Sequence, residues 1–166
     1  MANDMTGAGQ SLQDFERELG HSRHPQLAGL YRYWRSKCGD RRAPSRADIL
    51  PEEIRSILPH ILLLDIVGDV PRLKYRLAGT EFAHIYGAEV TGKFLDEIDF
   101  DGMRDLIIAD YFKVVKECQP SWTRWSFAKD DGRWLEYERV TLPLSQDGEQ
   151  VDMLLAGVGG GGLAAS

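Results

Sequence analysis

The chain has 166 residues and a mass of 18.7 kDa, the size of one domain whose core is large enough to fold without disulfides. Its net charge of −6 argues against a nucleic-acid partner, because such binding rests on clustered basic groups. The densest basic stretch, residues 41–46, is bracketed by Asp40 and Asp48, as is typical of a solvated loop. No apolar run approaches the ~18 residues of a membrane span. The first residues also lack the basic and apolar regions of an export signal, so we expect a cytoplasmic protein without a membrane span.

The two cysteines, Cys38 and Cys118, lie far apart in the sequence. Neither belongs to a CxxC pair or stands at metal-ligand spacing from a histidine. We therefore expect two free thiols that are buried or half-buried, and no metal site.

The N-terminal part of the chain predicts two helices. Residues 1–10 are small and polar, which is typical of a flexible terminus. Ser11 and the following acid resemble a capping box and begin a helix over 12–19. A second helix begins at Pro25, where the missing N–H costs nothing, and ends at Gly39. The apolar stripe of the first helix is equally consistent with packing on its own domain and with packing on a second copy or a partner protein.

The middle of the chain changes from helix to strand. Residues 40–50 are polar and contain a proline, so they predict a loop. A short helix then begins at Pro51 and ends at Pro59. Residues 61–67 form an apolar run and residues 73–78 alternate in polarity, so together they predict a β-hairpin.

The C-terminal half predicts a short helix, a long helix and three strands, over residues 80–86, 103–118, 121–127, 133–144 and 150–157. Asp-Gly pairs separate the three strands, which favours hairpins. This element order lacks the regular alternation of a doubly wound α/β fold. It predicts an α+β fold, with a five-stranded antiparallel sheet, helices on one face and an N-terminal helical extension. The glycine-rich residues 159–166 predict a flexible tail.

Several short sequence words, within residues 27–157, resemble the PAS sensor family. The resemblance is to its branch of stand-alone bacterial proteins, and the words are Leu-Tyr-Arg-Tyr-Trp-Arg at 30–35, Pro-Ser-Arg-Ala-Asp-Ile-Leu-Pro at 44–51, Leu-Pro-His-Ile at 58–61, Tyr-Arg-Leu-Ala-Gly-Thr at 75–80, Thr-Gly-Lys at 91–93 and Leu-Pro-Leu at 142–144. We accordingly divide the chain into a flexible N-terminus with a short helix (1–24), a PAS-like domain with leading helices (25–158) and a flexible tail (159–166).

A PAS-like sheet curves around a helical middle, so the resemblance implies a pocket between the two. Its candidate lining is aromatic, because aromatic side chains give a small organic ligand large apolar contacts. The candidate residues are Tyr75, Phe82, Tyr86, Phe94, Trp122, Trp125 and Trp134. The alternative is that these side chains simply fill a closed core.

The sequence offers two further kinds of site. A small anion would face Arg76 on the second strand and Arg124 or Arg139 on later strands. By alternation, however, Arg76 points to solvent and Arg124 shares a face with Trp122.

An enzyme of the cone-like α+β class would pair His84 with Asp96 or Asp99 for proton transfer. The sequence contains no Gly-x-Ser-x-Gly, no phosphate-binding glycine loop and no HExxH, so we expect no enzyme.

No cofactor is identified from the sequence. The flavin-binding type of the family carries an Asn-Cys-Arg-Phe-Leu-Gln word before its long helix, and nothing here resembles it. The heme-binding type uses a histidine on the long helix, and residues 103–118 contain none. A lone histidine such as His84 is more typical of a surface position than of an axial ligand. The resemblance thus disfavours both heme and flavin.

The resemblance implies a sensory or regulatory module that forms a homodimer. It would bind a small hydrophobic or aromatic metabolite and signal through protein–protein contacts. Because no kinase, cyclase or helix-turn-helix segment is recognisable, we expect a partner protein to have the output function. We expect this partner to contact the N-terminal helices. The alternative is a ligand-free scaffold with the same fold and a filled core.

Overall fold

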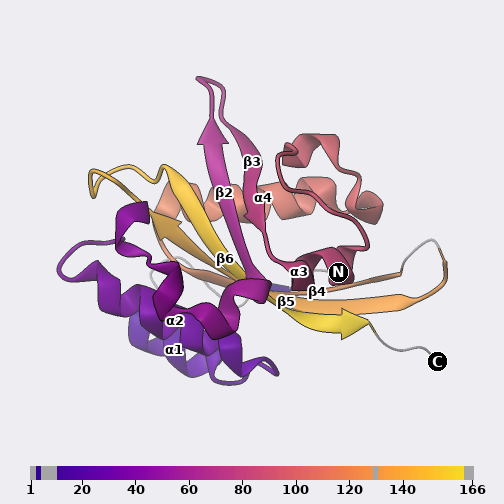
Figure 1. Cartoon of the computed structure of the whole chain (residues 1–166), viewed down its shortest axis with the longest axis horizontal. Coiled ribbons are helices and arrows are strands. Elements are labelled where there is room, and N and C mark those ends of the chain that lie inside the picture. The colour runs from indigo at the N-terminus through magenta and orange to yellow at the C-terminus, as the bar shows by residue number, and fades with distance from the viewer. Residues whose placement is uncertain (1–2, 5–10, 129–130, 163–166) are drawn as a thin grey trace.

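The chain folds around one antiparallel sheet (Figure 1). The structure is a computed structural model that describes residues 3–4, 11–128 and 131–162. The strands lie in the order β1-β4-β5-β6-β2-β3. Their bounds are β1 (Asn3–Asp4), β2 (Ile61–Val67), β3 (Arg72–Ala78), β4 (Ser121–Ala128), β5 (Trp134–Leu144) and β6 (Met153–Gly162). The predicted α+β fold with a five-stranded antiparallel sheet is confirmed, and the two-residue β1 adds a short edge strand beside β4.

Among the residues that the structure describes, four α-helices and five short 3₁₀ turns connect and cover the strands. The α-helices are α1 (Leu12–Leu19), α2 (Pro25–Cys38), α3 (Thr80–Tyr86) and α4 (Arg104–Glu117). The 3₁₀ turns are η1 (Arg46–Asp48), η2 (Pro51–Glu53), η3 (Arg55–His60), η4 (Leu95–Glu97) and η5 (Phe100–Gly102). Within the described ranges, no helix has the length and apolar character needed to cross a membrane.

The sheet has two covered faces, which we call inner and outer. On the inner face, Arg139 of β5 pairs with Asp110 of α4. On the outer face, a Cβ added to Gly157 of β6 would lie 3.2 Å or less from Leu27 and Leu30 of α2. Successive side chains of a strand alternate between these faces. The pairing register therefore assigns each strand residue to the inner or to the outer face.

The N-terminal helices dock on their own domain. Ser11 caps α1 by accepting a hydrogen bond from the Asp14 backbone N–H at 3.1 Å. Phe15 is buried, with its ring centroid 5.0 Å from that of Tyr31 on α2. Trp34 of α2 donates from Nε1 to the Pro143 carbonyl of β5 at 2.8 Å. The apolar stripe of α1 therefore packs within this chain.

The segment of residues 46–60 is wound more tightly than predicted. In place of a loop and one short helix, it forms the consecutive turns η1, η2 and η3. Pro59 removes an N–H donor that a continuous α-helix from Pro51 would need. The end of η3 approaches β3 so closely that a Cβ on Gly79 would lie 2.3 Å from the Pro59 carbonyl oxygen. This contact fixes the segment beside the sheet.

The C-terminal strand is longer than predicted. The sequence predicts a flexible tail from residue 159, whereas β6 continues to Gly162 and pairs with β5 up to Leu135. Close contacts require glycine at two of these positions, since a Cβ on Gly159 would lie 2.4 Å from Cγ of His24 and one on Gly160 would lie 2.7 Å from Cβ of Tyr137. The remaining tail (163–166) and most of the predicted flexible N-terminus (1–2 and 5–10) lie outside the described residues.

Candidate functional site

A row of aromatic rings covers the inner face at the β3 end of the sheet. Tyr75 of β3 contacts Phe82 of α3, with 5.7 Å between ring centroids. Phe82 stacks on Tyr86 at 6.0 Å, and Tyr86 contacts Phe100 at 5.2 Å. Gly79 and Gly87 flank α3, so the short helix presents these rings to the strand. Three of the predicted pocket residues, Tyr75, Phe82 and Tyr86, therefore lie together.

The other four predicted pocket residues are spread over the molecule. Trp125 is buried on the inner face and stacks on Tyr137 at 6.4 Å. Trp122 is buried on the outer face, where its Nε1 bonds to Glu138. Phe94 is partly buried beneath the Arg72 guanidinium, 3.8 Å from its ring centroid, and Trp134 is 48% exposed.

A buried arginine occupies the centre of the inner face. Arg139 is 1% exposed and forms an ion pair with Asp110 of α4. Its Nε donates to Oγ1 of Thr141 at 3.1 Å. The guanidinium lies 3.9 Å from the ring centroid of Tyr111 and 5.4 Å from that of Trp125. An arginine-anchored ligand was one hypothesis from the sequence, but here the guanidinium is already neutralised within the chain.

The protonation states of this cluster follow from burial. Removal from water raises the pKa of Tyr75, Tyr111 and Tyr137, so these phenols stay neutral at ordinary pH. Burial by itself lowers the pKa of Arg139, but the paired Asp110 carboxylate opposes this effect and the pKa is raised. The inner face therefore holds one charge-balanced pair surrounded by neutral aromatic side chains.

A buried carboxylate on the outer face joins the N-terminal helices to the sheet. Glu138 of β5, whose side chain is 4% exposed, accepts hydrogen bonds from Oγ of Ser22 at 2.5 Å and Nε1 of Trp122 at 3.0 Å. It also accepts from the Arg23 backbone N–H at 3.3 Å. Ser22 and Arg23 lie between α1 and α2, so this carboxylate fixes the point where the two helices meet. Arg124 of β4 lies 3.9 Å from the same carboxylate, as the sequence alternation predicted for the face of Trp122.

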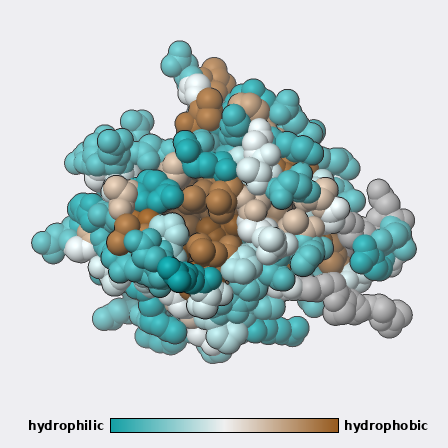
Figure 2. Space-filling view, viewed as in Figure 1, coloured by the Kyte–Doolittle hydropathy of each residue, from teal (hydrophilic) through white to brown (hydrophobic). Residues whose placement is uncertain are grey.

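An open apolar groove also lies on the outer face and was not foreseen from the sequence. It has a volume of about 510 Å³ and lies between residues 46–60 and the outer face of the sheet. Its apolar walls and floor include Ile49, Ile54, Leu58, Ile61, Leu63 and Leu155. Leu77 of β3, 42% exposed, lines its rim. Figure 2 shows the hollow apolar area near the centre of this face, bordered by hydrophilic residues.

The groove left only a weak signal in the sequence. Isoleucine and leucine recur between the prolines of residues 46–60, and that pattern is equally consistent with ordinary core packing. The groove forms because this segment stands off the sheet at one side while Gly79 holds it close at the other.

The remaining candidates from the sequence are the two cysteines and the histidine–aspartate pair. Cys38 and Cys118 are buried free thiols, as predicted, and burial raises the pKa of both. His84 is 77% exposed on α3, with Nδ1 3.5 Å from the Glu81 carboxylate one turn earlier. Asp96, one of its two proposed catalytic partners besides Asp99, instead receives two hydrogen bonds of 2.7 Å from Arg72.

Comparison with known proteins identifies the family. A family model described as a PAS domain matches residues 22–158. The match spans most of the chain, and the chain therefore belongs to the PAS domain family, which generally serves sensory or regulatory roles. The comparison with curated proteins found no match.

Solved structures of PAS and light-oxygen-voltage proteins resemble the chain at low sequence identity. The LOV protein of Rhodobacter sphaeroides is 16% identical, with a TM-score of 0.49 over 69% of this chain and 67% of that one. The PAS domain of a Colwellia psychrerythraea protein is 13% identical, with a TM-score of 0.48 over 66% and 94%. An RNA-binding light-oxygen-voltage receptor is 12% identical, with a TM-score of 0.49 over 96% of this chain but 38% of that one.

Proposed function

We propose that this chain is a sensory or regulatory module that binds a small apolar molecule and signals through contacts with another protein. The open groove on the outer face is the observation that carries this function. Its volume of about 510 Å³ lies within the range of ~300–1,000 Å³ that is usual for small-molecule sites. A ligand there contacts the sheet and residues 46–60 at the same time.

The groove is physically connected to the N-terminal helices. Tyr33 of α2 accepts a hydrogen bond from the Leu50 backbone N–H at 2.9 Å and donates one to Glu53 at 2.7 Å. Lys37 of α2 pairs with the same Glu53 at 2.9 Å. A ligand that shifts residues 46–60 therefore biases the position of α2, and a change in that population is the signal that a partner would read. Self-association through this region belongs to the same proposal.

The aromatic row on the inner face is the second candidate site. Tyr86 is only partly buried, and its stacking on Phe82 would allow a flat ligand to insert between α3 and β3. Against this, the rings contact one another directly, which favours a filled core and hence the ligand-free scaffold. An experiment has to separate these three possibilities.

Native mass spectrometry of the purified chain, repeated after denaturation, is that experiment. We expect a mass excess that disappears on denaturation and that is absent from Leu77→Trp, because a bulky ring at the rim fills the groove. Val70→Trp is the matched control, since Val70 is exposed and does not line the groove. If Tyr86→Ala rather than Leu77→Trp lacks the mass excess, the ligand binds at the inner face. A wild-type protein that carries no excess and takes up no apolar compound would refute ligand binding and leave the scaffold. The same spectra count subunits.

A further inference from the structure

The charged residues of the groove are of one sign. Arg46 and Arg55 are part of its lining, which contains no aspartate or glutamate among the described residues. The chain as a whole carries a net charge of −6. A positive rim on an acidic protein favours an anionic occupant, because like charges would otherwise meet at this surface.

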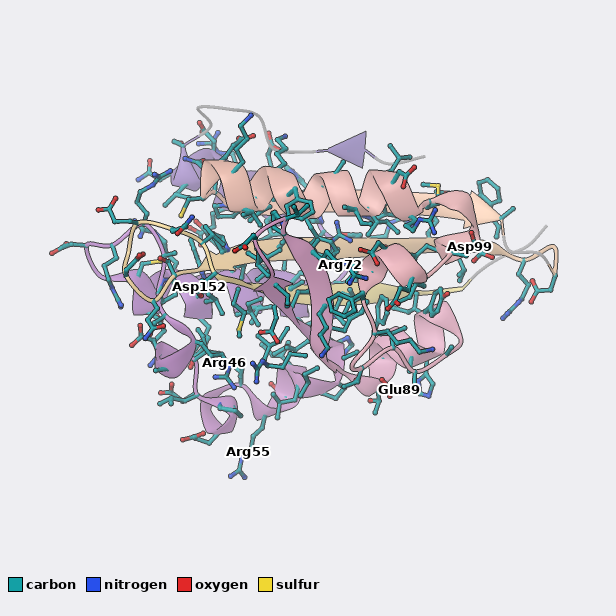
Figure 3. All side chains as sticks on the ribbon, turned by 90° about the horizontal axis from the view of Figure 1, so that it is seen from above. Arg46, Arg55, Arg72, Glu89, Asp99 and Asp152 are labelled. Atoms are coloured by element: carbon teal, nitrogen blue, oxygen red, sulfur yellow. The ribbon has the colours of Figure 1, made fainter. Side chains whose placement is uncertain are left out.

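Arg46 is held where it can contact a ligand. Its Nη1 donates to the Ile49 carbonyl at 3.0 Å, and the side chain is partly buried at the groove. That bond uses one of the five N–H donors of a guanidinium, whose geometry matches a carboxylate. Arg55 lies on the same side of the molecule and projects outward, as Figure 3 shows, so it stands at the open mouth.

The floor requires a different chemistry. Leu63 and Leu77 present only aliphatic carbon to the groove, and a polar body placed on them would lose hydrogen bonds to water. The occupant must therefore combine an apolar body with a charged end.

We infer that the groove binds a free carboxylic acid with an apolar body, whose carboxylate bonds to Arg46 while its hydrocarbon lies on β2 and β3. This inference rests on the proposed function, because it assumes that the groove is the ligand site. The positive charge of Arg55 attracts the anion to the mouth of the groove. The hydrogen bond from Arg46 makes the groove prefer an acid to a neutral analogue. A neutral alcohol gains the same apolar burial but lacks the charge-assisted bonds.

Isothermal titration calorimetry with decanoate, decanol and decylamine tests the inference. We expect decanoate to bind about tenfold more tightly than decanol, which is the size of effect that a charge-assisted hydrogen bond gives, and decylamine to bind most weakly. In the variant Arg46→Gln with Arg55→Gln, decanoate and decanol should bind equally. Arg133→Gln, which removes an exposed arginine from the β4–β5 connection, is the matched control and should bind like the wild type.

The possible results separate the two levels of inference. Equal binding of decanoate and decanol by the wild type would overturn the acid preference and leave the groove as a ligand site. Decanoate binding that persists in Leu77→Trp would place the acid elsewhere and overturn the assignment to this groove. If none of the probes binds and light scattering shows a dimer that Leu77→Glu dissociates, the occupant is a second copy, and both the inference and the proposed ligand site are wrong.

Discussion

Replacing Asp110 by alanine removes the counter-ion of a fully buried guanidinium. Arg139 is 1% exposed, and an arginine remains charged at any pH at which the protein is folded. The substitution therefore leaves a positive charge in the core beside Tyr111 and Trp125. Breaking a buried pair in this way costs about 3–5 kcal/mol, a large share of the ~5–15 kcal/mol that stabilises a domain. For a chain of this length the melting temperature should fall by roughly 10 °C or more.

Urea unfolding followed by tryptophan fluorescence measures this loss, and Trp125 lies close enough to Arg139 to report it. Asp96→Ala is the matched control, because it removes the carboxylate of the exposed Arg72 pair and should change stability far less. Replacing both buried partners, as in Asp110→Leu with Arg139→Met, should recover most of the loss, since no unpaired charge remains. If Asp110→Ala unfolds like Asp96→Ala, the buried pair does not have the energetic role assigned to it.

Three smaller changes test the outer face. Glu138→Ala removes the acceptor at the junction of α1 and α2, so amide hydrogen exchange should become faster in these helices while α4 is unchanged; equal protection throughout would contradict the role of this carboxylate. Gly159→Ala places a Cβ 2.4 Å from Cγ of His24, so we expect a lower melting temperature. An unchanged melting temperature would mean that His24 and the start of α2 can move aside without loss of stability. The Ser45 backbone N–H lowers the pKa of Asp48, so its contribution to stability is complete above the ordinary aspartate pKa and is lost as pH falls through the lowered value. Asp48→Asn should accordingly flatten the acid side of the stability profile, measured by urea unfolding at successive pH values.

The order of the elements was predictable because its signals are local. Each of these signals spans only a few residues: the apolar run of β2, the Asp-Gly turns between the last strands, and Gly39 at the end of α2. Alternation along β4 likewise predicts that Arg124 shares a face with Trp122, and both side chains lie at Glu138 on the outer face. The same local reasoning is wrong for Gly159–Gly162, since glycine is favourable both in a flexible tail and in a strand where a Cβ would meet a neighbouring segment, as at Gly159 and Gly160.

The candidate sites were decided by contacts between distant parts of the chain. Alternation shows that Trp122 and Trp125 point in opposite directions, but only the folded chain shows that Trp122 bonds to Glu138 on the outer face and that Trp125 lies beside Arg139 on the inner face. The groove depends in the same way on Ile49, Leu77 and Leu155, which come from three separate segments. Sequence periodicity determines which side of an element is apolar, because that depends on backbone geometry alone. Which apolar sides meet, and where they leave a space between them, is determined by the tertiary packing of the whole chain.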